Sequence, residues 1–265
     1  MTKWLFTDFD GTLRNSKGEE LRITPKDLDF VKKWQVDGNK LIIATGRPYE
    51  HISEHVNGVY DLYPDFYVTN AGGTVVDGEG KNIYTNTMTE EEKLKIMNFL
   101  IEIEDEIQGI VYSTPGDENF LFHKDWENAD QEMFMGMTPQ NLPINYVEDK
   151  TMICYKVLST DETWNKITKF LDDNNLNMNL TSNNLRGIKF SEIHHNNVNK
   201  GSAIRGLQSI LGFKDEDVIV AGDDNNDLSM FAEFFENSYI VTQPYNEDIR
   251  NKAETIISEL NEVVL

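Results

Sequence analysis

The sequence predicts an α/β protein in which a doubly wound parallel sheet carries an inserted α+β domain. Short apolar runs alternate with helical patterns at the start of the chain and again near its end. Between these two parts the pattern changes to hairpins and strands of the antiparallel kind. With 265 residues, the chain is long enough to bury the cores of two ordinary domains.

A strand, a helix and a second strand open the chain. The apolar run Trp4–Thr7 is typical of a buried strand, and Thr24 followed by Pro25 marks the start of a helix that Gly38 ends. A second apolar run covers residues 41–44. Two strands joined by one helix predict a parallel, Rossmann-like sheet that is covered on both faces.

Further elements of the same core follow. A helix over residues 48–57 leads to a third apolar strand at 65–69, which ends in a glycine-containing turn. The remaining predicted core elements are a hairpin with strands at 74–76 and 83–85, a helix from Asn199 to the stop at Gly212, strands at 218–221 and 239–241, and helices around 230 and over 246–253.

The middle of the chain reads as a separate α+β module, for which we predict the bounds 84–186. Its first helix begins at Thr89, where acidic residues fill the first turn. Its other elements are strands at 110–113, 120–123, 151–158, 177–181 and 187–193, and helical segments at 126–135 and 161–173. The core domain then comprises residues 1–83 and 187–265.

Two acidic side chains stand at the end of the first strand. Asp8 and Asp10 precede Gly11, and alternation along a strand lets both carboxylates enter one pocket. Such a pair suits Mg²⁺ chemistry, in which one carboxylate binds metal and attacks an electrophile while the other manages a proton. An aspartate-rich structural turn fits the same residues, and this motif alone leaves both interpretations open.

The overall charge restricts the partners. Asp and Glu number 46 against 24 Lys and Arg, for a formal charge of -22, which repels nucleic acid and anionic membranes. No segment approaches the roughly 18 apolar residues of a membrane span, and no secretory signal opens the chain. Cys154 is the only cysteine, so an intrachain disulfide is impossible. We therefore expect a cytoplasmic protein that binds neither nucleic acid nor membrane.

The polar residues after the core strands predict one shared site. In an open α/β sheet, the carboxyl ends of the strands line a single crevice. Carboxylates for a divalent cation, with cations and a hydroxyl for an anion, suit phosphoryl transfer. The side chains that we expect in this crevice are those of Asp8, Asp10, Thr45, Arg47, Lys200, Asp223 and Asp227.

These motifs, in this order, resemble those of the haloacid dehalogenase (HAD) superfamily. The matching segments are Asp8-Phe9-Asp10-Gly11-Thr12, Thr45-Gly46-Arg47, Lys200-Gly201 and Gly222-Asp223-Asp224-Asn225-Asn226-Asp227. Asn70-Ala71-Gly72-Gly73 and the Asn-Asp ending of the last motif resemble the Cof-type phosphatases of that superfamily. The long insertion between Thr45 and Lys200 resembles a cap domain of type C2, and its α/β content resembles subclass IIB.

The resemblance implies catalytic roles for four residues. Asp8 would be the nucleophile that becomes an aspartyl phosphate. Asp10 would protonate the leaving oxygen and then activate the hydrolytic water. Thr45 would hydrogen-bond the phosphoryl group, while Lys200 would neutralise it and orient Asp8.

The resemblance also implies a metal site and a phosphate site. Mg²⁺ would be bound by Asp8, by the backbone carbonyl of Asp10, by Asp223 and by Asp227, the last either directly or through water. The residues implied near the phosphate or the rest of the substrate are Gly46, Arg47, Asn70 and Asn226.

The function expected from these features is Mg²⁺-dependent hydrolysis of a small phosphorylated metabolite, such as a sugar phosphate or a cofactor phosphate. The cap domain would exclude water and determine substrate specificity. A phosphotransferase or phosphomutase on the same fold remains an alternative, as does a non-catalytic regulator that binds a phosphorylated metabolite. The sequence leaves open whether the protein is a monomer or a homodimer.

Overall fold

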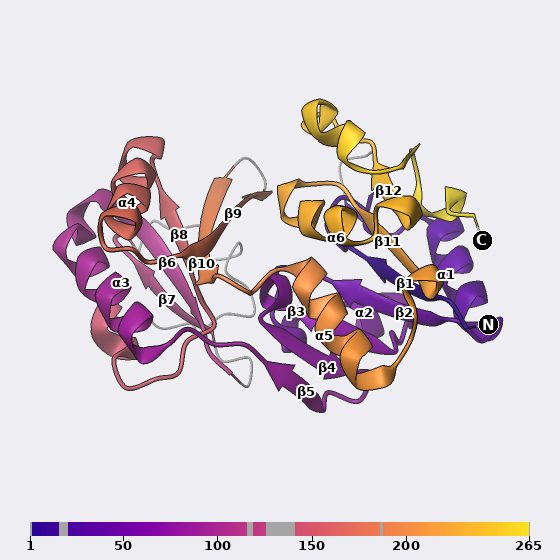
Figure 1. Cartoon of the computed structure of the whole chain (residues 1–265), viewed down its shortest axis with the longest axis horizontal. Coiled ribbons are helices and arrows are strands. Elements are labelled where there is room, and N and C mark those ends of the chain that lie inside the picture. Colours follow the sequence, from indigo (N-terminus) through magenta and orange to yellow (C-terminus); the bar gives the residue numbers. More distant parts are fainter. Residues whose placement is uncertain (1, 16–20, 116–118, 126–140, 186–187, 265) are drawn as a thin grey trace. The chain divides into compact units, whose positions relative to one another are not determined.

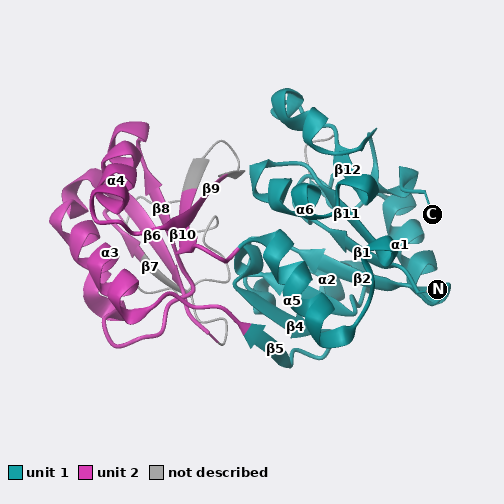
Figure 2. Ribbon diagram, viewed as in Figure 1, with its two compact units in different colours: residues 1–84, 199–265 teal, residues 85–198 magenta. Residues whose placement is uncertain are grey.

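The computed structural model of the protein describes residues 2–15, 21–115, 119–125, 141–185 and 188–264. Contacts within it divide the chain into two compact units (Figure 2). Unit 1 comprises Met1–Tyr84 and Asn199–Leu265, and unit 2 comprises Thr85–Val198. The helical segment predicted at 126–135 lies outside the described residues.

The described residues of unit 1 form one eight-stranded sheet and four α-helices (Figure 1). Its elements are β1 (Trp4–Thr7), α1 (Pro25–Val36), β2 (Lys40–Ala44), α2 (Tyr49–Tyr60), β3 (Phe66–Thr69), β4 (Thr74–Asp77), β5 (Asn82–Thr85), α5 (Lys200–Leu211), β11 (Val218–Gly222), α6 (Leu228–Glu233), β12 (Ser238–Val241) and β13 (Thr255–Ile257).

The order of the strands places the first strand at the centre of the sheet. The order is β13-β12-β11-β1-β2-β3-β4-β5, and β1 pairs in parallel with both β11 and β2. The strands from β13 to β3 are parallel, while β4 runs antiparallel to β3. Because the chain extends from β1 first to one side and later to the other, the carboxyl end of β1 is the topological switch point of the sheet.

Helices on both faces bury the sheet. Alternate residues of each strand enter two separate cores, so that Leu5 lies in one core and its neighbour Phe6 in the other. Val31 of α1 and Ile52 of α2 pack into the first core, whereas Leu207 of α5 packs into the second, together with residues of α6. This two-faced burial explains why the central strands are almost entirely apolar, with Thr or Lys only at their ends.

The helix starts follow the capping chemistry of the sequence. The Thr24 side chain accepts a hydrogen bond from the amide of Asp27, with Pro25 in the first turn of α1. Asn199 and Ser202 form a reciprocal capping box at the start of α5, which is closed by Gly212 in the left-handed conformation. The α5 cap fixes the backbone at Lys200, the first residue of that helix.

Unit 2 is built on a second, antiparallel sheet with the order β7-β6-β8-β10-β9. Leu100 of α3 and Ile167 of α4 pack with Ile110 and Tyr155 of the sheet in one core. The elements are α3 (Glu90–Glu102), β6 (Ile107–Ser113), β7 (Asn119–His123), β8 (Cys154–Ser159), α4 (Asp161–Asp173), β9 (Met178–Leu185) and β10 (Ile188–His195).

The second boundary between the units differs from the predicted one. The sequence places the return to the core at residue 187, whereas unit 2 continues to Val198. The reason is pairing: β10 is antiparallel to both β8 and β9, which ties residues 188–195 to the sheet of unit 2. The apolar pattern of a strand does not by itself reveal which of the two sheets the strand joins.

The end of the chain also differs from the prediction. The helix predicted at 246–253 is a 3-10 helix over Glu247–Lys252, and the edge strand β13 (Thr255–Ile257) follows it. This strand has only three residues and pairs with β12 alone, so its sequence signal is weak.

Among the described residues, no helix combines the length and apolarity needed to cross a bilayer.

The packing of α5 can be tested with one substitution at two sites. Leu207 is 0% exposed and Leu211, one turn later, is 42% exposed. We expect Leu207→Ala to lower the free energy of unfolding by about 2–5 kcal/mol, because it leaves a cavity in the core. Leu211→Ala should change it by about 0.5 kcal/mol or less. Urea denaturation measures both, and equal losses would contradict this packing of α5.

Candidate active site

The carboxyl ends of three neighbouring strands hold the first group of site residues. Asp8 follows β1, Thr45 follows β2, and Asp223 follows β11. The parallel pairing of β1 with β11 extends as far as Asp8, whose amide donates a hydrogen bond to the carbonyl of Ala221 at 2.8 Å. The predicted convergence of these strand ends is thus a consequence of parallel pairing at the switch point.

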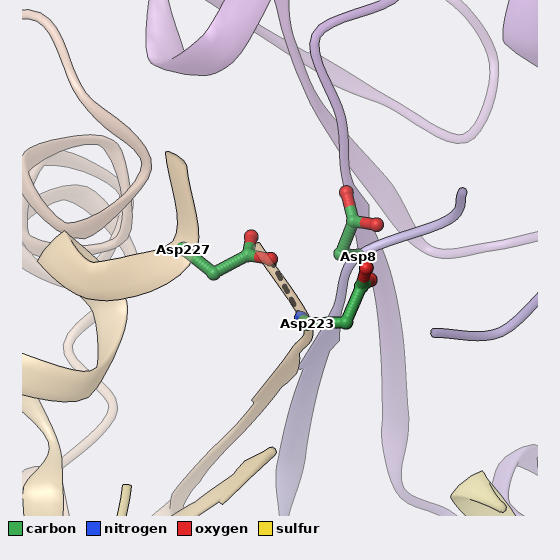
Figure 3. A group of neighbouring side chains, drawn as sticks. All are labelled: Asp8, Asp223 and Asp227. Atoms are coloured by element: carbon green, nitrogen blue, oxygen red, sulfur yellow. Dashed lines mark hydrogen bonds between the residues drawn. The ribbon is translucent and has the colours of Figure 1, made fainter. Parts of the chain in front are cut away.

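Three carboxylates lie close enough to share one metal ion. Asp8, Asp223 and Asp227 each offer an oxygen atom, and these oxygens lie within 4.8 Å of one another (Figure 3). All three residues are buried. Carboxylate oxygens are the ligands that hard divalent cations such as Mg²⁺ prefer, so the chemistry of this donor set fits such an ion.

Lys200 connects two of these acids. Its ammonium nitrogen Nζ lies 2.7 Å from Oδ1 of Asp8 and 2.7 Å from Oδ1 of Asp227, and the residue is 0% exposed. Burial lowers the pKa of Lys200, but the two carboxylates outweigh burial and raise this pKa above its ordinary value. The lysine therefore stays charged in the buried site.

Burial shifts the pKa of the carboxylates upward, opposite to its effect on the pKa of Lys200. Burial raises the pKa of Asp8 to about 7, with Lys200 opposing this shift and Asp227 adding to it. Burial also raises the pKa of Asp223, and the charges of Asp8 and Asp227 act in the same sense. Crowded carboxylates of this kind favour a bound cation, because a positive ion removes the repulsion between them.

Asp227 is held by the turn that precedes α6. Its Oδ2 accepts hydrogen bonds from the amides of Asp223 at 2.9 Å and Asp224 at 3.1 Å. The turn is a short 3-10 helix, Asn225–Asp227, and Asn226 is half-buried there, one residue before Asp227. The backbone amides of two acidic residues thus orient the side chain of a third.

The side chain of Asp10 lies outside the three-carboxylate group. Arg47 binds it with two hydrogen bonds, Nε to Oδ2 at 2.6 Å and Nη2 to Oδ1 at 2.8 Å, and Arg14 also donates to Oδ1. Both guanidinium groups lie over the Phe9 ring. Burial raises the pKa of Asp10, but Arg47 and Arg14 more than compensate and hold this pKa below its ordinary value.

The remaining predicted residues surround the end of β2. Thr45 is 2% exposed, and its hydroxyl accepts a hydrogen bond from the amide of Arg47 at 3.2 Å, with Gly46 between them. The buried Asn70 has a left-handed backbone with φ of 49°, and its amide donates to the carbonyl of Arg47 at 3.1 Å. The turn after β3 therefore supports the loop that carries Arg47.

Sequence reasoning missed several residues that contact this site. Thr12 stands inside the first motif without a predicted role, and Arg14 is not among the predicted site residues, although they donate hydrogen bonds to Asp223 and Asp10. Tyr245 and Asn246 follow β12 and hydrogen-bond Asp223, while Gln243 donates to the carbonyl of Gly11. The available signal was position: a polar segment directly after a parallel strand lies at the same edge as the other strand ends.

Comparison with known proteins identifies the family. A family model described as haloacid dehalogenase-like hydrolase matches residues 5–262. The chain therefore belongs to the haloacid dehalogenase-like hydrolases, which confirms both the resemblance of its motifs and the predicted class of enzyme. The α/β fold with a mainly parallel central sheet agrees with this assignment.

Individual relatives extend the comparison. A protein of Mycoplasma capricolum subsp. capricolum with the name "Uncharacterized protein" is 46% identical over 99% of each chain. "Putative phosphatase YxeH" of Bacillus subtilis is 24% identical, over 87% of this chain and 84% of its own length. The solved structure of the HAD subclass IIB sugar phosphatase BT4131 matches with a TM-score of 0.78 at 20% identity, over 98% of this chain and 95% of that one. This last match confirms the predicted fold.

The close approach of the β1 and β11 loops makes Gly11 sensitive to substitution. Gly11 has φ of +101°, and an added Cβ would lie 2.3 Å from Oδ2 of Asp223; Gly38 has φ of +85° with nothing within 4 Å. Gly38→Ala should cost about 1–2 kcal/mol of unfolding free energy through backbone strain alone. We expect Gly11→Ala to cost clearly more in urea denaturation, because it also displaces Asp223. Similar costs would show that the two loops are not in this close contact.

Proposed function

We propose that the protein is a Mg²⁺-dependent phosphatase that hydrolyses a phosphate ester of a small metabolite through an aspartyl phosphate on Asp8. The observation that carries this proposal is that the two acids of the first motif, Asp8 and Asp10, have different surroundings. Asp8 is buried beside Lys200 in the carboxylate group, whereas Asp10, two residues later, is held apart by arginines. Membership of the hydrolase family and the names of the relatives support the same activity.

The proposed metal site uses the donor set described above. Asp8, Asp223 and Asp227 would hold the ion with their carboxylates, and Asp10 would contribute its backbone carbonyl. Bound there, Mg²⁺ would supply positive charge that keeps Asp8 ionised and offsets the charge of the phosphoryl group. The preference of Mg²⁺ for oxygen ligands makes it the expected ion.

In the first step, a carboxylate oxygen of Asp8 attacks the phosphorus atom of the ester. The bond between phosphorus and the leaving oxygen breaks as the new bond to Asp8 forms, and Asp10 gives a proton to the leaving oxygen. Both oxygens of Asp10 accept hydrogen bonds from Arg47 in this structure, so the incoming ester must displace one of these contacts. Lys200 holds Asp8 in place throughout.

In the second step, water hydrolyses the aspartyl phosphate. Asp10, now ionised, takes a proton from the water, whose oxygen attacks phosphorus and releases inorganic phosphate and free Asp8. The lowered pKa of Asp10 keeps its carboxylate ionised, which is the form that this second step requires, whereas the first step requires the protonated form. Thr45 would donate to the phosphoryl oxygens, and Gly46, Arg47, Asn70 and Asn226 would complete the phosphate and substrate contacts.

Unit 2 is proposed to act as the cap domain that determines specificity. Its chain leaves unit 1 after β5 and returns immediately before Lys200, so it is inserted between two parts of the proposed site. HAD phosphatases act on phosphorylated substrates, and a sugar phosphate or cofactor phosphate is the proposed substrate here. The subclass IIB sugar phosphatase among the matching structures supports this choice.

Replacing the nucleophile tests the proposal directly. Asp8→Asn should lower the hydrolysis of p-nitrophenyl phosphate in the presence of Mg²⁺ by roughly three orders of magnitude or more, because no aspartyl phosphate can form. The matched control is Asp224→Asn, since Asp224 caps the turn before α6 and lies outside the carboxylate group. We expect this control to stay near wild-type activity. Full activity of Asp8→Asn would rule out the assigned nucleophile.

The arginines around Asp10 predict a shift in pH dependence. Arg47 and Arg14 lower the pKa of Asp10, so Arg14→Gln should raise this pKa toward its ordinary value. Because the first step needs protonated Asp10, the alkaline limb of kcat/KM should move to higher pH. Arg14→Lys keeps the positive charge and serves as the control. If the alkaline limb of the kcat/KM profile is unchanged in Arg14→Gln, Asp10 is not the general acid of the first step.

A further inference from the structure

A tyrosine that the proposed reaction does not use contacts a proposed metal ligand. The hydroxyl of Tyr245 donates a hydrogen bond to Oδ2 of Asp223 at 2.5 Å. On the other side of the same carboxylate, the hydroxyl of Thr12 donates to Oδ1 at 2.6 Å. Tyr245 is 50% exposed, whereas Asp223 is 1% exposed, so the phenol reaches inward from the surface with its polar end on a buried acid.

The segment that carries Tyr245 is anchored to the same strand end. The side-chain amide of Asn246 donates to the backbone carbonyls of Asp223 and Val241, both at 2.8 Å, and Asn246 is 1% exposed. Arg250 holds this amide in turn, because its Nε donates to Oδ1 of Asn246 at 3.0 Å. The backbone beside Tyr245 is therefore fixed relative to the residue that its hydroxyl contacts.

The same segment also reaches the loop after β1. Gln243 donates from Nε2 to the carbonyl of Gly11 and to Oδ1 of Asn15, each at 2.5 Å. Arg250 donates to the carbonyl of Gln243 at 2.8 Å and so closes the segment on itself. The residues from Gln243 to Arg250 thus connect the loop of Asp8 and Asp10 with that of Asp223.

Two hydroxyl donors on one carboxylate have a defined consequence for a metal ligand. Each carboxylate oxygen has two lone pairs, so one hydrogen bond per oxygen leaves the second lone pair for a cation. The two donors prevent rotation of the carboxylate and hold these free lone pairs in one direction. Partners of this kind typically change metal affinity by about 10–100-fold when they are removed.

We propose that Tyr245 is a positioning residue that orients Asp223 for the divalent cation and thereby sets the affinity of the site for Mg²⁺. The inference rests on the proposed Mg²⁺-dependent function. In the described part of the chain, Tyr245 forms no hydrogen bond with Asp8 or Lys200, so its hydrogen bonding reaches the metal ligands through Asp223.

The test compares two removals of a tyrosine hydroxyl in the full-length protein. Tyr245→Phe removes the donor to Asp223, while Tyr239→Phe removes a hydroxyl on β12 that donates to the carbonyl of Val264 at 3.1 Å. Mg²⁺ binding is measured by isothermal titration calorimetry without substrate. We expect Tyr245→Phe to weaken binding by about tenfold and Tyr239→Phe to leave it within about twofold.

A second readout separates metal affinity from the chemistry. For Tyr245→Phe, the Mg²⁺ concentration at half-maximal hydrolysis of p-nitrophenyl phosphate should rise by about tenfold, while kcat at saturating Mg²⁺ stays within about twofold. The thermal unfolding midpoint of this variant without metal should match that of the wild type, because the aromatic ring remains.

The outcomes distinguish this inference from the proposed function. Unchanged Mg²⁺ affinity in Tyr245→Phe, with normal binding by the wild type, would overturn the role of Tyr245 only. Tighter binding would also overturn it, because the hydroxyl would then compete with the metal. A wild-type protein that binds no Mg²⁺ would contradict the proposed function itself, and the inference with it.

Discussion

The buried contact of Lys200 with Asp8 and Asp227 is the interaction on which the rest of the site depends. Three carboxylates and one ammonium group lie out of water at the end of the central strand, and such charges persist only when they are paired. The capping box at Asn199 places the lysine, and the backbone amides of the Asp223 turn place Asp227. The order of the strands and the start of α5 must therefore be such that the Lys200 ammonium contacts both acids at once.

The two acids of the first motif show how position separates chemistry. Asp8 has a pKa raised by burial, and Asp10, only two residues further, has a pKa lowered by guanidinium groups. Environments that push the pKa values of neighbouring acids apart are typical of sites that divide nucleophilic and proton-transfer roles. Arg47 comes from the end of β2, so the separation arises from strand pairing as much as from the motif itself.

The core of unit 1 could be predicted well because its signals are local. Apolar runs at buried strands, Thr24 with Pro25, and the capping residue Asn199 each act within a few residues of the chain. The less accurate predictions concern pairing over long distances. Strand β10 pairs with β9, which precedes it directly in sequence, but also with β8, which lies before α4, and β13 is defined only by its contact with β12. The same limit applies to Tyr245, whose partner Asp223 comes from another strand.

The sequence by itself determined the fold class, the family motifs and the residues that gather after the parallel strands, because strand direction alone brings those residues to one edge of the sheet. Only the tertiary structure decided which of them share a site and which do not. It joined Asp8, Asp223 and Asp227, paired Asp10 with arginines, and added the Gln243 to Arg250 segment. The physical reason is that hydrogen bonds and ion pairs between distant segments depend on side-chain directions within a fraction of an ångström, and a linear pattern does not contain these directions.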